Sequence, residues 1–262
     1  SLFVILLNRD LCIVHNRIPS VFLQDTWQVA RSLRIHAGMR WDGQFLVGSN
    51  GEVAQKITDQ FQPRLGFIFT PDDDQKIYGS FGRFAQEVHT VFSQFYHSEQ
   101  GYFYIIRYLQ DPRTGNVPAD TLVNQPKRIE PEVPGLRGQY YDEFSLGYER
   151  MIGANLKMSV QGVYRTLREA IEDGYVPSEG RYLPGNPGRG ALSDFPRAQR
   201  DYTAISITVE ERGSGPFNFL ASYVLSRNYG NYPGLFDAYY PLTGTNLTFA
   251  FDDVGALRNA TG

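Results

Sequence analysis

Three features that mark other protein classes are missing from this sequence. It contains a single cysteine, Cys12, so it cannot form an internal disulfide, and a cysteine-based metal site is not expected. It has no run of about 18 apolar residues, which excludes a membrane-spanning helix. Its lysines and arginines do not form a basic patch and its formal charge is −3, so nucleic acid is not an expected partner.

Aromatic residues, by contrast, are abundant. The 262 residues include 17 Tyr and 18 Phe, and aromatic residues make up 14% of the chain. Aromatic side chains favour β-strands and gather at membrane interfaces. The hydrophobic content of 42% does not separate a soluble protein from a membrane barrel, because only half of a barrel wall is apolar.

The segment from Leu33 to Asp42 alternates strictly between two kinds of residue. Its odd positions are apolar until Trp41, and its even positions are Arg34, His36, Gly38, Arg40 and Asp42. Successive side chains of a strand point to opposite faces, so this pattern predicts a strand with one apolar and one charged face. A membrane-spanning barrel needs such strands, with the apolar face toward lipid and the polar face toward a solvated lumen.

The same pattern recurs and predicts eight strands in four hairpins. Each hairpin has a short connection rich in Gly, Pro, Asp or Asn, which are residues that suit tight turns. The expected pairs are 21–29 with 33–42, 64–70 with 77–84, 142–150 with 156–165, and 203–211 with 217–226. The gaps at 43–63, 85–141 and 166–202, and the residues after 227, are expected to be long loops.

We therefore predict an all-β fold: an antiparallel transmembrane β-barrel segment, part of a larger barrel, with short periplasmic turns and long extracellular loops. Strands of about nine to eleven residues match the length that a tilted transmembrane strand needs. An antiparallel sandwich with one solvated face produces the same alternation. A secreted sandwich that binds carbohydrate is therefore the alternative function, and an outer-membrane enzyme is a third.

Several of these segments, taken in order, resemble elements of TonB-dependent receptors, nearest to the Oar-like group. QDTW at 24–27 followed by GMRWD at 38–42 is similar to the paired QDxW and LxxGxRxD elements of that family. Further elements that resemble the family are PRLGF at 63–67, YGSFGRF at 78–84, EFSLGYER at 143–150, ASYVLS at 221–226, DDVG at 252–255 and NATG at 259–262.

The resemblance implies an outer-membrane barrel of about 22 strands that is plugged by an N-terminal domain. Such receptors bind a scarce nutrient and import it with energy passed by the TonB complex. Outer-membrane lipid, an unknown nutrient and TonB are thus the implied partners, and no cofactor is implied. We expect residues 1–20 to be an N-terminal segment outside the matched pattern and residues 21–262 to be a partial barrel domain without its plug.

The sequence offers no catalytic constellation and no convincing metal site, so we predict that the protein is not an enzyme. His89 and His97 lie in one predicted loop without a metal-binding spacing such as H-E-x-x-H. His36 is expected on the polar wall. The run Asp72-Asp73-Asp74 lacks the spacing of a calcium loop and is expected to be a solvated turn.

Tyrosines in the long loops are the candidate ligand contacts. An exposed tyrosine offers a large contact area at a low entropy cost, which suits recognition. An aromatic girdle at the membrane interface would use the same residues, and that alternative stays open. The predicted ligand-binding residues are Tyr102, Tyr104, Tyr108, Tyr229, Tyr232 and Tyr239.

Overall fold

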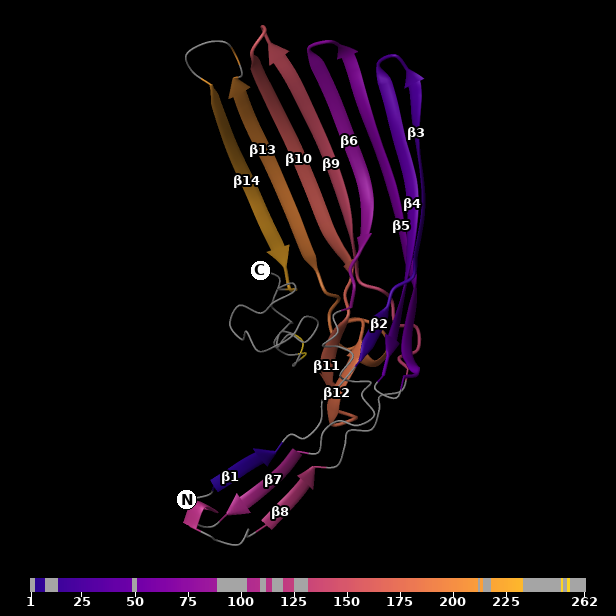
Figure 1. Ribbon diagram of the computed structural model, residues 1–262, viewed down its shortest axis with the longest axis vertical. Coiled ribbons are helices and arrows are strands. Elements are labelled where there is room, and N and C mark those ends of the chain that lie inside the picture. The colour runs from indigo at the N-terminus through magenta and orange to yellow at the C-terminus, as the bar shows by residue number, and fades with distance from the viewer. Residues whose placement is uncertain are drawn as a thin grey trace. The chain divides into compact units, whose positions relative to one another are not determined.

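The computed structural model consists of β-strands joined by turns and loops (Figure 1). It describes residues 3–7, 14–48, 51–88, 103–108, 112–114, 120–124, 132–211, 213, 218–232, 251 and 254. The chain forms two compact units. The first unit comprises 1–17, 45–56 and 89–133, and the second comprises 18–44, 57–88 and 134–262. Among the described residues no helix is long and apolar enough to cross a membrane.

The first unit contains a small antiparallel sheet. Its strand order is β1-β7-β8, with β1 at Phe3–Leu7, β7 at Phe103–Tyr108 and β8 at Asp120–Asn124. A short strand, β2 at His15–Arg17, pairs with Phe45–Val47 in the same unit. Residues 15–17, which the sequence pattern left unassigned, therefore join a strand ladder.

The larger sheet contains all eight predicted strands. They are β3 (Ser20–Ala30), β4 (Leu33–Val47), β5 (Val53–Asp72), β6 (Gln75–Ala85), β9 (Tyr140–Ile152), β10 (Leu156–Glu169), β13 (Arg200–Glu211) and β14 (Phe219–Gly230). The order is β14-β13-β10-β9-β6-β5-β4, with β3 paired to β4. Each predicted hairpin pair is found, and within the described residues the sheet stays open, with β14 at one end and, at the other, β3 and β2, which both pair with β4.

The strands extend beyond their predicted ends. The predicted loop at 43–63 is wrong, because β4 runs to Val47 and β5 already begins at Val53. Gly43 and Pro63 are residue types that often interrupt a strand, and they led to the prediction of a loop. Long-range contacts override that signal, as when the Trp41 indole N–H donates to the Thr58 carbonyl over 2.8 Å.

The predicted loop at 166–202 is also partly structured. It contains a hairpin of β11 (Glu172–Val176) and β12 (Arg181–Gly185), followed by the 3₁₀ turn η3 (Gly190–Leu192). Its apolar side chains pack into a small core with residues at the ends of the long strands. This core consists of Leu167, Ala170, Leu192, Phe195, Ala198, Tyr232 and Phe251.

The described short connections, between β3 and β4, β5 and β6, and β9 and β10, lie at one edge of the large sheet, here called the turn edge; the opposite ends of the long strands form the edge here called the loop edge (Figure 1). Gly153 has φ of 67° in the β9–β10 turn, a conformation that favours glycine. In the β5–β6 turn the Asp72 carboxylate accepts hydrogen bonds from the Asp74 backbone N–H and the Gln75 amide, at 3.0 and 2.6 Å. The aspartate run thus forms a turn, as predicted.

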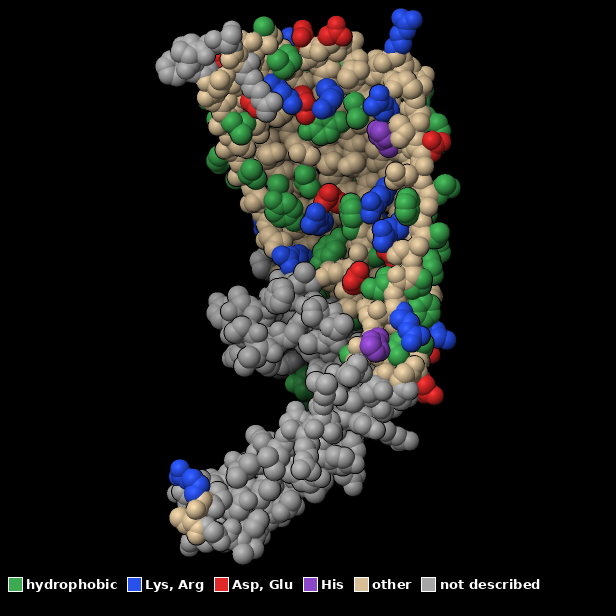
Figure 2. Space-filling view, in the orientation of Figure 1, with side chains coloured by type: hydrophobic (Ala, Val, Ile, Leu, Met, Phe, Trp, Pro, Cys, Tyr) green, Lys and Arg blue, Asp and Glu red, His purple; other side chains and the backbone are tan. Residues whose placement is uncertain are grey.

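The large sheet has an apolar face and a polar face. On β9 the apolar face carries Phe144, Leu146 and Tyr148, which are 45%, 60% and 37% exposed. The alternate residues Glu143, Ser145, Gly147 and Glu149 form the polar face and are half-buried or buried. Charged side chains of both signs lie across the hollowed face turned to the viewer in Figure 2. Exposed apolar and sheltered polar side chains reverse the arrangement of a soluble sandwich.

A glycine on the polar face makes room for a tyrosine of the next strand. Gly147 lies directly opposite Tyr78, and a Cβ atom at Gly147 would overlap the Tyr78 ring. We expect Gly147→Val to destabilise the barrel by about 1–3 kcal/mol because the ring must move. Adding Tyr78→Ala should recover much of that loss. Unfolding of the two single variants and the double variant in urea measures the coupling, and additive effects would contradict the contact.

Candidate functional site

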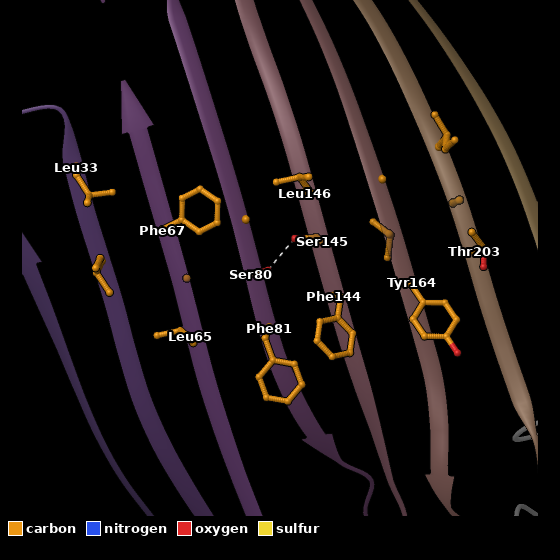
Figure 3. A pocket seen from close by; sticks show the side chains of 17 residues that line it. Leu33, Leu65, Phe67, Ser80, Phe81, Phe144, Ser145, Leu146, Tyr164 and Thr203 are labelled. Carbon is orange, nitrogen blue, oxygen red and sulfur yellow. Dashed lines mark hydrogen bonds between the residues drawn. The ribbon is translucent and has the colours of Figure 1, made fainter. Parts of the chain in front are cut away.

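The apolar face holds a shallow depression between β4 and β13 (Figure 3). Its volume is about 850 Å³, and its walls include Phe67, Phe81, Phe144 and Tyr164. Gly79 and Gly162 face Leu146 from the two neighbouring strands, so the sheet surface is lowered there. Such an apolar surface suits contact with hydrocarbon chains. On the opposite, polar face of the same strands, the Ser80 and Ser145 hydroxyls, 2.7 Å apart, bond to each other.

Toward the loop edge the apolar face ends at a cluster of charges. Asp142 is only 5% exposed, and its two carboxylate oxygens accept from Arg83 at 2.8 Å and Arg168 at 3.1 Å. Asp142 is the next residue on this face after Phe144. Placing these three charged side chains against hydrocarbon would cost desolvation free energy. The band suited to lipid therefore ends here, and the strands continue beyond it.

The polar face carries ion pairs across neighbouring strands. Near the turn edge, Glu149 accepts from Lys76 of β6 at 3.0 Å and from Lys157 of β10 at 2.9 Å. Farther toward the loop edge, the Arg165 Nε donates to Glu143 over 2.6 Å. His36, predicted on this wall, bonds through Nδ1 to the Thr26 hydroxyl at 2.9 Å. Cross-strand pairs of opposite charge stabilise the sheet and keep this face hydrophilic.

A buried network of amide side chains joins the long strands to the segments at the loop edge. The Gln44 side-chain amide donates to the Gln60 side-chain oxygen Oε1 at 2.7 Å, and its own oxygen accepts from the Val88 backbone N–H at 2.8 Å. Gln139 donates to Gln86 at 2.8 Å and accepts from the Ile171 N–H at 3.1 Å. Gln44 and Gln139 are each 1% exposed. This network fixes the polypeptide where it leaves the sheet.

The Asn186 side chain extends the same arrangement to the β11–β12 hairpin. Its amide donates to the backbone carbonyls of Ala170 and Arg137, at 2.7 and 3.0 Å, and its oxygen accepts from the Arg137 N–H at 2.8 Å. Asn186 is 4% exposed. One side chain therefore satisfies three backbone groups and ties two loop-edge segments together.

A second cavity, here called the loop-edge pocket, lies on the polar face beside this network. Its volume is about 580 Å³. It is lined by Phe84, Ala85, Gln86, Tyr141, Arg165, Arg200, Tyr202 and Asn228. The strand register explains the grouping, because Tyr202 of β13 lies opposite both Arg165 of β10 and Asn228 of β14. This pocket combines cations, aromatic rings and an amide, which are the groups that bind small polar ligands.

The predicted ligand tyrosines are not gathered in one place. Tyr229 is 37% exposed on the apolar side of β14, with the Arg227 guanidinium 5.1 Å from its ring centre. Tyr104 and Tyr108 belong to β7 in the first unit. Tyr102 and Tyr239 lie outside the described residues, as do His89 and His97.

Tyr232 departs from the expected exposure. It is 3% exposed and packs in the loop-edge core, 6.1 Å from the Phe251 ring. Burial, together with the nearby Glu172 carboxylate, raises the pKa of Tyr232. Tyr232 follows the end of β14 in a segment without a regular apolar pattern, so the sequence gave no sign of this packing.

Sequence reasoning missed the loop-edge pocket. Tyr141, Arg165, Arg200 and Tyr202 all occupy polar-face positions near the loop-edge ends of their strands. This shared position could have identified the pocket from the sequence, because the predicted long loops begin or end at these strand ends. Within the part of the chain that the structure describes, no three His, Cys, Asp or Glu side chains lie close enough together to hold a metal ion.

Comparison with known proteins points to one family. Residues 14–103 match the family model "TonB dependent receptor-like, beta-barrel". The TonB-dependent transporter Oar of Myxococcus xanthus is 26% identical over 273 residues, which cover 92% of this chain and 26% of Oar. The chain thus spans about a quarter of that relative's length.

Solved structures show the same fold. The FrpB iron transporter from Neisseria meningitidis, F3-3 variant, superposes with a TM-score of 0.52 at 9% identity, covering 83% of this chain and 26% of FrpB. The apoprotein form of the F5-1 variant gives a TM-score of 0.53 at 10% identity, with coverages of 84% and 27%. A sandwich is not favoured, because both the neighbours and the exposed apolar face fit a barrel wall. The chain is therefore similar to part of the β-barrel of TonB-dependent receptors and shares their fold.

Proposed function

We propose that this chain forms part of the wall of a receptor that binds a scarce nutrient outside the cell and imports it with energy from TonB. The observation that carries the proposal is the pairing of two surfaces on one sheet. The apolar face is exposed as a lipid-facing wall would be. The polar face carries ion pairs and the loop-edge pocket, as a ligand path would.

Outer-membrane lipid, a nutrient ligand and the TonB complex are the proposed partners of the whole receptor. Residues 21–262 would supply part of its barrel, and contact with TonB would be made by another part of the receptor. Transport, rather than catalysis, is the proposed activity. The proposed ligand contacts are Tyr102, Tyr104, Tyr108, Tyr229 and Tyr239. Tyr232 is buried, and we propose that it supports the packing of the loop-edge core instead.

Growth on single limiting nutrients tests this function. A strain that lacks the full-length receptor should grow at least about tenfold less on one nutrient, and the wild-type gene should restore growth. Removing TonB should abolish the restored growth, because import needs its energy. Equal growth of the deletion and parent strains on every limiting nutrient would contradict an import function.

A further inference from the structure

We propose that the depression on the apolar face binds one acyl chain of a membrane lipid whose phosphate headgroup contacts Arg227. This inference rests on the proposed receptor function, because that function places the apolar face against lipid. One position on this face is then assigned to a lipid of defined chemistry. Three features support the assignment: the shape of the depression, its direction across the sheet, and the cation at its loop-edge end.

Side chains form the sides of the depression, and backbone forms part of its floor (Figure 3). Phe67, Phe144 and Tyr164 are among the walls. Among the described residues, a Cβ atom at Gly162 would have only the Leu146 carbonyl oxygen within 4 Å, at 3.9 Å, so the space above Gly162 is open. Apolar walls beside an open floor give an acyl chain more dispersion contacts than a regular strand surface gives.

The depression crosses the sheet obliquely between its two edges. At one end it includes Leu33, the first residue of β4 after the turn edge. At the other end it includes Thr203, three residues from Arg200 at the loop-edge end of β13. A chain that lies along the depression therefore runs from near the loop edge into the middle of the apolar face. A lipid tail runs inward from its headgroup in the same way.

Arg227 lies at the loop-edge end of the depression. It is directly opposite Thr203, on the same face of the neighbouring strand β14. The Arg227 guanidinium lies over the Tyr229 ring, 5.1 Å from its centre, and among the described residues it makes no ion pair. A guanidinium that lies over a ring keeps the N–H groups at its edge for a phosphate. The Thr203 hydroxyl offers a further donor beside it.

The charges around Arg227 leave it available. The cluster of charges around Asp142 is paired internally, so it is not counted as a phosphate contact. The Asp201 carboxylate accepts from the Tyr164 hydroxyl at 3.4 Å. An outward-facing arginine costs least where the hydrocarbon layer meets the headgroups, which is the level of a lipid phosphate. The open end of the depression and this level therefore coincide at Arg227.

Lipid binding to the full-length receptor in detergent tests the proposal, with native mass spectrometry to measure the affinity for each added probe. The probes are dimyristoyl phosphatidic acid, dimyristoylglycerol, which has the same chains without the phosphate, and glycerol 3-phosphate, which has the headgroup without the chains. We expect phosphatidic acid to bind about tenfold more tightly than dimyristoylglycerol, and glycerol 3-phosphate to show no saturable binding.

Two variants separate the contributions of the headgroup and the chain. Arg227→Gln should remove the preference for phosphatidic acid, whereas Arg34→Gln, which removes the same charge from the polar face, should retain it. Gly162→Leu should weaken the binding of both lipids about fivefold, because the leucine fills the depression. Ala221→Leu is its control, since it adds a leucine to the apolar face outside the depression.

Equal binding of phosphatidic acid and dimyristoylglycerol would overturn the proposal, as would glycerol 3-phosphate binding as tight as that of phosphatidic acid. Equal losses in Arg227→Gln and Arg34→Gln, or in Gly162→Leu and Ala221→Leu, would also overturn it. A receptor that imports its nutrient without this lipid preference overturns only this inference. A receptor that has the lipid preference and imports nothing overturns only the proposed function.

Discussion

Leu146→Arg is expected to destabilise the receptor in a lipid bilayer by about 2–4 kcal/mol, the cost of an arginine on the lipid face near the bilayer midplane. Leu146 is 60% exposed, lies in the middle of β9 and is bordered by the depression on the apolar face. On a surface that faces water, replacing an exposed leucine with arginine would change the free energy of unfolding only slightly. The expected loss therefore arises only if this face contacts hydrocarbon.

The measurement is urea unfolding of the full-length receptor from lipid vesicles. Ser159→Arg is the matched control, since Ser159 lies on the polar face opposite Glu149 and near Lys157. A cation there faces water and a carboxylate, so we expect a change within about 0.5 kcal/mol. Equal losses for the two variants would contradict the assignment of the faces.

Gln44→Leu is expected to cost about 1–3 kcal/mol for each buried group that loses its partner, among them the Val88 backbone N–H and the Gln60 side-chain oxygen. Leucine has a similar size, so packing changes little while the hydrogen bonds of 2.8 and 2.7 Å disappear. The Gln44 side chain is 1% exposed, and water cannot replace it without opening the loop edge.

Two readouts separate local from global effects in this variant. Unfolding in urea gives the total loss, and hydrogen exchange of the peptide that ends at Val88 should become at least tenfold faster. Gln28→Leu serves as the control, because Gln28 also makes side-chain bonds, to the Ala30 carbonyl at 2.7 Å among others, but is exposed. Unchanged exchange at Val88 in Gln44→Leu would show that the amide network does not hold this segment.

The eight long strands were predictable because their information is local. Alternation in segments such as 33–42 and 142–150 assigns each side chain to a face, and short Gly- or Asp-rich connections assign the hairpins. The apolar residues Phe144, Leu146 and Tyr148 were placed on the exposed face from that alternation alone, and their exposure in the structure agrees.

The loop edge was not predictable because its structure depends on long-range contacts. Gln44 bonds to residues 16 and 44 positions later in the sequence, and Asn186 to a residue 49 positions earlier. No periodic pattern carries such pairings. The same reason explains why Tyr232, which looks like an exposed loop tyrosine, is buried against Phe251.

The most direct test of the central claim is the accessibility of successive positions along β9. In the full-length receptor with Cys12 replaced by serine, single cysteines at positions 143–146, 148 and 149 would carry spin labels in lipid vesicles. Labels at 144, 146 and 148 should collide with lipid-soluble oxygen, and those at 143, 145 and 149 should show lower oxygen accessibility. Oxygen accessibility that does not alternate along β9 would contradict a lipid-facing apolar wall.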